Sequence, residues 1–331
     1  VGCRDQVVTT TVNKVCASGM KAVMLGAMLI QCGERDVVLV GGSESMSNCP
    51  HYVSGMRFGV KYGDSTLIDG LQCDGLQDPE TKASMGEFAE RLAEREGFTR
   101  EEQDAYATES YRRAVWAQES GKFAEEIVPV TVRVRGRESV VAEDEEPSRG
   151  DPSQFPTLRT PFRKDGTVTA ATSSPLSDGG AALVLVSEAY LEKHPEITPL
   201  AKIVSYGDAA QAPEFFTTSP RLAALKALDK AGLSPADMRA WEVNEAFANV
   251  AQVFIRHLEL DPRTVNMYGG AVAIGHPIGC SGARILVTLI NVLGQETSPE
   301  NQDSAYGCAA ICNGGGGASA VVLQRLFPPT S

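Results

Sequence analysis

The sequence VNKVCASGMKAVMLGAMLI, at residues 12–30, places a cysteine and a glycine directly before a run of apolar residues of helical character. A β-branched run precedes it at 7–12, and the apolar segment 36–40 follows it and ends in two glycines. This order predicts a strand, a tight turn, a buried helix and a second strand. Such an alternation is typical of α/β proteins built from packed layers.

Two segments in the second half of the chain are similar to parts of the first half. GCSGAR at 279–284, before the apolar helix 285–293, resembles the turn at Cys16 and its helix. GGASAVVL at 316–323 is likewise similar to DGGAALVLV at 178–186. The repetition predicts two similar halves with parallel strands and buried helices.

The composition changes between about residues 50 and 162, where charged residues become frequent. Segments 83–96 and 100–123 have the pattern of amphipathic surface helices. The charged run 143–149, with two prolines after it, predicts an exposed loop. We therefore expect a domain inserted into the first half of the chain.

The overall composition restricts the partners of the protein. The chain has 331 residues, of which 43% are hydrophobic, and a net charge of -12. An acidic surface argues against a nucleic-acid partner, and a polyanionic ligand would have to be held by local cations and helix N-termini. No uninterrupted apolar run reaches transmembrane length, so we expect no membrane span. The chain begins with Val1 rather than Met, as expected of a fragment or a processed product.

Eight cysteines without a secretory leader indicate a reducing compartment with free thiols, so we do not expect a secreted protein. Cys16 lies where a strand meets a helix, and there the unpaired N–H groups and the helix dipole favour a thiolate nucleophile. The alternative for any of these thiols is a small buried core residue. That is our interpretation of Cys3, Cys32, Cys49, Cys73 and Cys280.

Three further motifs contain candidate site residues. His276 lies in a glycine-rich frame at 269–279 that suits a general base. Cys312 opens CNGGGG, whose backbone N–H groups suit an oxyanion, although a plain tight turn is the alternative. Asn244 opens NEAFA at 244–248, where a helix cap is the default interpretation. A zinc site made of His276, Cys280, Cys308 and Cys312 is disfavoured, because the spacings match no zinc frame.

Together the four motifs resemble the signature blocks of the thiolase family. VNKVCASGMKA, NEAFA, GHPIG and CNGGGG occur in the family's order and spread over nearly the whole chain. The greatest similarity is to the acetoacetyl-CoA thiolases (acetyl-CoA acetyltransferases), including the potassium-activated mitochondrial type. The resemblance implies an α/β protein with a layered αβαβα fold of two similar domains. It places an N-terminal domain at 1–55 and 163–196, a loop domain for CoA binding at 56–162 and a C-terminal domain at 197–331.

The resemblance also implies roles for the motif residues. Cys16 would be the acylated nucleophile, His276 the base that activates it, and Cys312 the group that moves a proton at the substrate α-carbon. Asn244, through a bound water, and His276 would stabilise the enolate oxygen. The backbone N–H groups of Cys16 and Gly314 would bind the tetrahedral oxyanion. The reaction would condense two acetyl-CoA to acetoacetyl-CoA and CoA, or run in reverse, and would require no cofactor.

Further positions match family residues that contact the CoA thioester. Arg149 matches a residue near the adenine and phosphates, and Ser174 one near the pantetheine, whereas Gln154 replaces a lysine of the mitochondrial type. The remaining substrate-binding candidates are Met85, Tyr111, Ala246 and Phe247. Residues that match a potassium site, largely through backbone carbonyls, are Tyr111, Ala170, Ala171, Ser173 and Val272. Short-chain members usually have His-Met-Gly where this chain has Ser84-Met85-Gly86, so the acyl pocket is expected to differ.

Two alternatives share the same motifs. One is a degradative 3-ketoacyl-CoA thiolase for longer chains, and the other is a truncated, inactive subunit that acts as a binding protein. The second is relevant because the family has further strands and helices before the nucleophile block. The related condensing enzymes pair their cysteine with two histidines, so the Cys312 block disfavours them. The family implies a homo-oligomer, either dimer or tetramer, in mitochondria or the cytoplasm.

Overall fold

The computed structural model describes residues 2–134, 136–298, 300 and 305–327. Its helices are α1 (Ser18–Gln31), α2 (Met85–Glu96), α3 (Arg100–Glu119), α4 (Glu146–Arg149), α5 (Glu188–Lys193), α6 (Ser219–Ala231), α7 (Ala248–Leu258), α8 (Ala271–Ile274) and α9 (Ile278–Glu296). Its strands are β1 (Val37–Ser45), β2 (His51–Tyr52), β3 (Ile68–Asp69), β4 (Val130–Val134), β5 (Arg137–Val141), β6 (Asp178–Val186), β7 (Ala201–Ala210), β8 (Met238–Val243), β9 (Tyr306–Asn313) and β10 (Gly317–Arg325).

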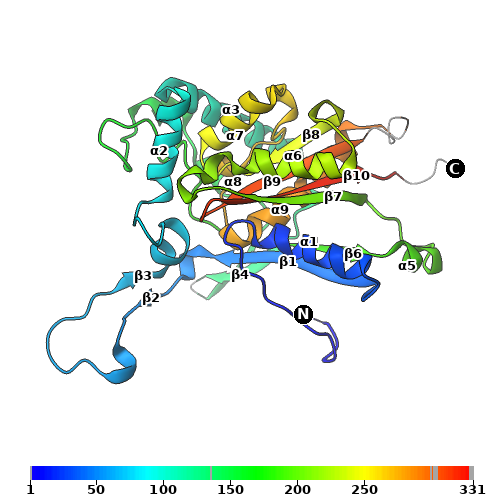
Figure 1. Ribbon diagram of the computed structural model, residues 1–331, viewed down its shortest axis with the longest axis horizontal. Coiled ribbons are helices and arrows are strands. Elements are labelled where there is room, and N and C mark those ends of the chain that lie inside the picture. The colour runs from blue at the N-terminus through cyan, green and yellow to red at the C-terminus, as the bar shows by residue number, and fades with distance from the viewer. Residues whose placement is uncertain (1, 135, 299, 301–304, 328–331) are drawn as a thin grey trace.

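The elements form layers in the order helix, sheet, helix, sheet (Figure 1). Helices α6 and α7 cover one face of a sheet with the order β7-β10-β9-β8. Helices α1 and α9 separate that sheet from the pair β1-β6. The largest part of the core lies in the middle layer, where Met20 and Met24 of α1 pack with Leu286 and Leu289 of α9. The layered arrangement and the duplication predicted from the sequence are therefore confirmed, although these elements form four layers and not the five of the αβαβα order that the resemblance implies.

The predicted parallel strands are mostly wrong. Only β8 and β9 run parallel in the part of the chain that the structure describes, and β10 is antiparallel to both β9 and β7. The connection from β9 to β10 is the glycine turn 314–316, and so short a connection can join only antiparallel strands. In the other sheet β1 and β6 are also antiparallel.

Two local predictions also need correction. The run 7–12 is not a strand and pairs with none among the described residues. GCSGAR at 279–284 is not a turn before a helix but lies within the first turns of α9, which begins directly after Pro277. Proline favours the position before or at the start of a helix, because its missing N–H is not needed there. The two predicted helices are confirmed as α2 and α3, but only α2 is amphipathic, because α3, which ends at Glu119, also buries the polar Gln103, Asp104 and Ser110.

Glycines bring α1 and α9 into close contact. A Cβ added to Gly19 would lie 2.7 Å from the backbone nitrogen of Ala283, and one added to Gly282 would lie 2.5 Å from that of Met20. Because real Cβ atoms do not approach so closely, each helix requires glycine at the crossing. Helix α9 is long and apolar enough to cross a membrane, but it is a core helix that lies between the two sheets. The contact places the N-terminal ends of α1 and α9 side by side.

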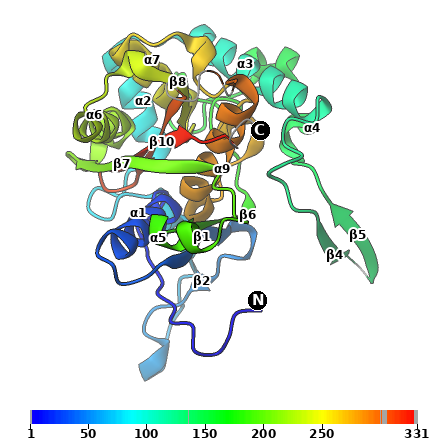
Figure 2. The ribbon, with the colours of Figure 1, turned by 90° about the vertical axis from the view of Figure 1, so that its right-hand side faces the viewer.

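The inserted region contributes α2, α3, α4 and the hairpin β4-β5, which extends away from the rest of the molecule (Figure 2). Both α2 and α3 begin with capping boxes, formed by Ser84 with Glu87 and by Thr99 with Glu102. Ser84 therefore caps a helix at the position where a pocket histidine is usual. A second projection, residues 53–67, connects β2 to β3 and is called the arm below (Figure 1). The boundaries proposed for the inserted domain stay a prediction.

Candidate active site

The loop before α1 is tied to the four-stranded sheet by an ion-pair network. Lys14 Nζ donates to Asp208 Oδ1 at 2.5 Å and to Ser319 Oγ at 2.8 Å, and Lys21 Nζ donates to Asp208 Oδ2 at 2.6 Å. Burial raises the pKa of Asp208, but the hydrogen bonds from Lys14 and Lys21 hold it at about 2. Asp208 therefore stays ionised near neutral pH and holds the loop from both sides of Cys16.

The residue before Cys16 has an unusual backbone conformation. Val15 has a φ of 49°, in the left-handed region that β-branched residues avoid. Ser18 supports this turn, because its hydroxyl donates to the Val15 carbonyl at 2.6 Å and accepts from the Lys14 N–H at 2.8 Å. Strain of this kind persists only where surrounding contacts hold it, and it is concentrated at functional sites. The turn places Cys16 two residues before α1.

Cys16 is a thiol at rest and not the thiolate that its position at a helix start predicted. Burial raises the pKa of Cys16 to about 11, although hydrogen bonds from the backbone N–H groups of Gly314 and of Cys16 itself act to lower it. The Glu44 carboxylate raises it further. The helix terminus favours a negative charge here, but the loss of water outweighs it.

His276 lies in the loop between α8 and α9. Its Nδ1 is 2.5 Å from Ser281 Oγ, and its Nε2 is 3.4 Å from Asn244 Nδ2. Arg284 Nη1 donates to the Gly275 carbonyl at 2.7 Å and thereby fixes the start of this loop. Burial, with a smaller effect of the Arg284 charge, lowers the pKa of His276 to about 3. The imidazole is therefore neutral and can accept a proton from a neighbouring acid.

Asn244 does not cap a helix, because α7 begins only at Ala248. Its backbone N–H donates to the carbonyl of Ala310 in β9, at 3.0 Å. Its side chain is buried, and its Oδ1 has no hydrogen-bond partner among the residues that the structure describes. A buried acceptor without a partner is costly unless a water or a ligand satisfies it. The default interpretation as a cap is therefore wrong.

Cys312 is the last residue but one of β9 and is fully buried. Burial raises its pKa, and the nearby Cys16 raises it further. The glycines after it form the turn into β10, in which Gly315 and Gly316 both have a φ of 86°. The glycine run is therefore a tight turn, and it also directs the Gly314 N–H at Cys16, whereas its role in binding an oxyanion stays a prediction.

Several predicted substrate-binding residues gather around Cys312. Met85, Ala246 and Phe247 pack with it in one buried apolar cluster. Ser174 is adjacent, because its hydroxyl donates to the carbonyl of Ala246 at 3.0 Å. The cluster forms an apolar wall beside a reactive thiol, as expected of a site that excludes water.

Arg149 and Tyr111 form a second group. Arg149 is the last residue of α4 and is exposed, with ion pairs to Glu145 at 3.1 Å and Glu146 at 3.5 Å. Tyr111 packs against the next residue, Gly150, closely enough that any side chain there would overlap its ring. The structure therefore brings these two residues together, and Arg149 is a cation available to an anionic ligand.

The residues of the predicted potassium site are neighbours. One buried cluster contains Tyr111, Ala171 and Val272. Ala170 is exposed beside it, and the Ser173 hydroxyl donates to a backbone carbonyl four residues earlier, at 2.7 Å. Among the described residues, no three His, Cys, Asp or Glu side chains are placed to share a metal ion. An ion here would be held by carbonyl groups, which suit a hard cation.

The sequence analysis missed residues that support the site. Ser281 and Arg284 hold His276 and its loop, and both lie in GCSGAR, which was used only as a sign of duplication. Glu44 Oε2 accepts from the Gly279 N–H at 3.0 Å and connects β1 to α9. Asp208 gave no signal, because its partner Lys14 is 194 residues away in the chain.

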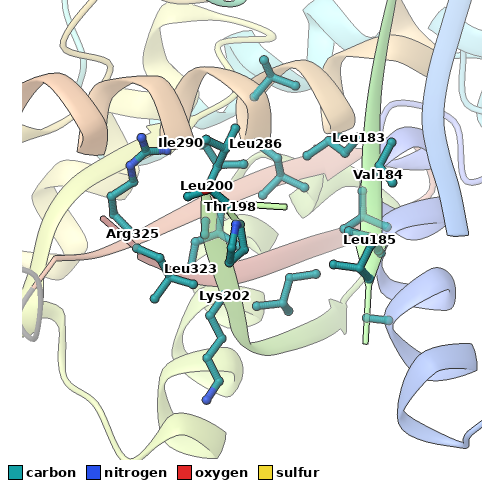
Figure 3. Close-up of a pocket in the computed structure, with 18 of the residues that line it drawn as sticks. Leu183, Val184, Leu185, Thr198, Leu200, Lys202, Leu286, Ile290, Leu323 and Arg325 are labelled. Carbon is teal, nitrogen blue, oxygen red and sulfur yellow. The ribbon is translucent and has the colours of Figure 1, made fainter. Parts of the chain in front are cut away.

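A cavity of about 980 Å³ lies elsewhere, between β6, β7 and α9 (Figure 3). Leu183, Leu286 and Leu323 line it, together with the cationic side chains of Lys202 and Arg325. None of the four predicted catalytic residues is among its lining residues. The cavity is therefore separate from the candidate active site.

The layered fold and the cysteine, histidine and asparagine motifs define an acyl-transfer class, and comparison with known families agrees. Residues 1–189 match the N-terminal domain of thiolase, and residues 197–325 match its C-terminal domain. The chain therefore belongs to the thiolase family.

Individual relatives are more specific. The chain is 49% identical over 329 residues to acetyl-CoA acetyltransferase of Saccharomyces cerevisiae, which covers 98% of this chain and 81% of that protein. It is 48% identical over 327 residues to a Gibberella zeae acetyl-CoA acetyltransferase described as cytosolic, with 98% and 81% covered.

Solved structures give the same result. The Acat5 thiolase from Ascaris suum, in complex with coenzyme A, superposes with a TM-score of 0.88 and 46% identity, over 95% of this chain and 78% of that one. Human mitochondrial 3-ketoacyl-CoA thiolase has a TM-score of 0.89 and 38% identity, again over 95% and 78%. The predicted thiolase fold is confirmed.

Proposed function

We propose that this protein is an acetyl-CoA C-acetyltransferase, which condenses two acetyl-CoA to acetoacetyl-CoA and CoA or catalyses the reverse thiolysis. The observation that carries the proposal is 49% identity over 98% of the chain to a protein of that activity. The pairs Asn244–His276 and Cys16–Cys312 support it, as does the close contact between the starts of α1 and α9, because together these residues supply a nucleophile, a base and a second acid or base.

In the first half-reaction Cys16 attacks the thioester carbonyl of acetyl-CoA. Because the thiol and the imidazole are both neutral at rest, His276 takes the proton as the sulfur attacks. The backbone N–H groups of Cys16 and Gly314 already face the sulfur, and they would hold the oxyanion of the tetrahedral intermediate. Loss of the CoA thiolate, which takes up the thiol proton of Cys312, leaves an acetyl group on Cys16, the proton of Cys16 on His276 and a thiolate at Cys312.

In the second half-reaction Cys312 removes an α-proton from a second acetyl-CoA. The enolate oxygen would accept hydrogen bonds from the protonated His276 and from a water held by Asn244. The unpartnered, buried Oδ1 of Asn244 supports that water, since it needs a donor. The enolate carbon then attacks the acetyl group on Cys16, acetoacetyl-CoA forms and the thiol is regenerated.

The substrate would lie between the two residue groups described above. Arg149 would exchange its exposed ion pairs with Glu145 and Glu146 for a CoA phosphate. Ser174 would contact the pantetheine, with Tyr111 beside it. Met85, Ala246 and Phe247 would line the acyl pocket beside Cys312. The acetyl-CoA acetyltransferases of Saccharomyces cerevisiae and Gibberella zeae are 49% and 48% identical to this chain, against 38% for human mitochondrial 3-ketoacyl-CoA thiolase, which supports the short acyl group.

A potassium ion would activate the enzyme by ordering the loop around Ser174. The adjacency of Tyr111, Ala171 and Val272 supports this, because it brings backbone carbonyls near that loop. We expect faster thiolysis of acetoacetyl-CoA in potassium than in sodium at matched ionic strength. Equal rates in the two salts would contradict the proposal.

A homo-oligomer is supported by the arm, which exposes large apolar side chains to solvent. Of the two compartments expected, the cytoplasm is supported by the description of the Gibberella zeae relative.

Mass spectrometry after incubation with acetyl-CoA tests the function directly. We expect Cys16, alone among eight cysteines, to gain an acetyl group, and a subsequent addition of CoA to remove it. Turnover of acetoacetyl-CoA against a long-chain ketoacyl-CoA then measures the acyl preference. An acetyl group spread over several cysteines, or absent, would contradict the mechanism.

A further inference from the structure

Ser281 lies in the first turn of α9 and is completely buried. Its Oγ is 2.5 Å from His276 Nδ1 and 3.0 Å from the Pro277 carbonyl oxygen. The other ring nitrogen of His276, Nε2, is 3.4 Å from the amide nitrogen of Asn244. Both nitrogens of the imidazole therefore have a neighbour within the protein.

Only one tautomer of a neutral imidazole satisfies all three contacts. A serine hydroxyl has a single proton, and a carbonyl oxygen can only accept, so the proton of Ser281 is directed at Pro277. Ser281 Oγ must then accept a proton from His276 Nδ1. The Asn244 amide nitrogen is a donor, and it requires a lone pair on His276 Nε2. The opposite tautomer would place two donors against each other at Asn244 and would remove the Pro277 hydrogen bond.

We propose that Ser281 is a positioning residue that holds His276 as the Nδ1–H tautomer and so leaves Nε2 as the proton acceptor. The assignment of Nε2 as base to Cys16 rests on the proposed function, whereas the tautomer itself does not. Ser281 need not touch the substrate, since it acts through the imidazole ring. A partner that fixes the ring and its tautomer is a known requirement of histidine bases.

The neutrality of Ser281 has a further consequence for the two half-reactions. A carboxylate at this place would stabilise an imidazolium at rest, and the base would then already be protonated. A hydroxyl accepts the Nδ1–H without adding charge, and the nearby Arg284 also disfavours the imidazolium. His276 is therefore free to accept the Cys16 proton first and to donate the new Nε2–H to the enolate afterwards.

The tautomer can be measured without a variant and without activity. The chain has only four histidines, so long-range ¹H–¹⁵N spectra of protein labelled with ¹⁵N-histidine can resolve each ring. His276→Asn assigns its signals. We expect the proton of His276 on Nδ1 and a lone pair on Nε2 at neutral pH. A proton on Nε2, or on both nitrogens, would overturn the proposal.

Variants then test the consequence. Ser281→Ala removes the acceptor, and we expect mixed tautomers and acetylation of Cys16 slowed by about 10-fold to 100-fold, as for other residues that orient a ligand or base. Because Ser281 does not contact substrate, kcat should fall while KM for acetyl-CoA changes little. Ser281→Thr keeps the hydroxyl and should restore the wild-type tautomer and most of the rate.

Ser205→Ala is the matched control, because Ser205 is also buried and also donates to a backbone carbonyl, that of Ala227 at 2.6 Å. It should lower stability without changing the His276 spectrum or the rate. If Ser281→Ala left both the tautomer and the rate unchanged, Ser281 would have no positioning role. If wild-type protein did not acetylate Cys16, the proposed function would fail, and the spectrum would still decide the tautomer.

Discussion

The resting state of the nucleophile is decided by the environment of single residues. The sequence locates Cys16 at the start of a helix, and it predicted a thiolate for that reason. It does not reveal that the same turn is covered by the glycine loop after β9, whose residues lie about 300 positions further along the chain. Burial there raises the pKa of the thiol to about 11, and it lowers that of His276 to about 3.

Alkylation of Cys16 should therefore depend steeply on pH. The thiolate fraction of a group with a pKa of about 11 rises about tenfold for each pH unit below that value. We expect the rate of Cys16 modification by iodoacetamide to rise from pH 7 to pH 9 without levelling off, as followed by mass spectrometry of the Cys16 peptide. A plateau near neutral pH would instead indicate a thiolate paired with an imidazolium.

Variants of Cys16 and Cys312 should be defective in different steps of the reaction. Cys312→Ser replaces the thiol with a hydroxyl too weakly acidic to serve as a base, so α-proton exchange and condensation should fall about a hundredfold or more, while acetylation of Cys16 survives. Cys16→Ala should abolish the acetyl-enzyme but leave some enolisation of bound acetyl-CoA. Deuterium exchange into the acetyl methyl group, measured beside acetyl-enzyme formation, separates the steps. Exchange at the parent rate in Cys312→Ser would refute its acid/base role.

At the residue scale, the sequence predicts those candidate site residues that lie in a recognisable local pattern. Cys16, His276 and Cys312 each lie within three residues of a glycine, and glycines mark close backbone approach whatever the rest of the fold does. Asn244 was interpreted as a cap, because a polar residue before an apolar run has that pattern, and only the structure shows that the helix begins four residues later. Asp208 and Glu44 were missed, because their roles depend on partners distant in the chain.

At the scale of elements, the site depends on the glycine contact between α1 and α9. We expect Gly282→Ala to push α1 away, since the added Cβ would lie 2.5 Å from the Met20 backbone nitrogen. Overpacking of this kind costs about 1–3 kcal/mol. Because Cys16 and His276 lie at the ends of these helices, we also expect kcat to fall at least tenfold, by an order-of-magnitude estimate for a misplaced catalytic group.

The control is Gly294→Ala on the same helix. There the nearest atoms belong to the flexible side chain of Arg325, at 3.1 Å, which can move aside. Urea unfolding and steady-state thiolysis should therefore distinguish the two variants. Equal activity in both would show that the helix contact does not position the site.

A contact between Glu126 and helix α9 makes the stability of the protein depend on pH. Glu126 accepts hydrogen bonds from Thr288 and Asn291 of α9, at 2.9 Å each, and burial nevertheless raises its pKa to about 7. In the unfolded chain Glu126 releases this proton near its ordinary pKa of 4.5. The contribution of Glu126 to the stability of the folded state is therefore favourable below pH 4.5 and is lost as the pH rises through about 7.

Glu126→Gln imitates the protonated acid and should remove this dependence. At pH 8.5 we expect the variant to be more stable than the parent by about 1–3 kcal/mol, and at pH 5 to differ little. Urea unfolding at the two pH values measures both differences. A variant less stable than the parent by the same amount at both would show that the carboxylate is not penalised in the folded state.

At the scale of the whole molecule, duplication was predictable because apolar and glycine patterns repeat, whereas strand direction was not. An apolar run buried on both faces looks the same in parallel and antiparallel sheets. What distinguishes them here is the connection, a glycine turn between β9 and β10 and the whole inserted domain between β1 and β6. The arm gave no signal in sequence, because its apolar residues are exposed by the backbone path and not by their pattern.

The arm also carries the prediction about assembly. Phe58 is 89% exposed and Tyr62 fully exposed, and the arm projects beyond the layers (Figure 1). Burying such a side chain stabilises an association by about 1.5–3 kcal/mol. An arm that remained exposed to water would lose this favourable free energy. The arm also carries Arg57 and Lys61 in a chain of net charge -12, and a second copy therefore offers it an acidic surface. We expect the wild-type protein to be a homo-oligomer through this arm.

The double variant Phe58→Ser/Tyr62→Ser should lower the assembly state, because it removes the apolar contact and leaves the layered core unaltered. Sedimentation velocity at micromolar concentration measures the species, and raised salt should weaken the remaining association, since screening removes the charge attraction. Val128→Ser is the control, because Val128 is 80% exposed but lies outside the arm, and it should sediment like the parent. A monomeric parent, or a double variant that assembles as the parent does, would show that the arm has another purpose.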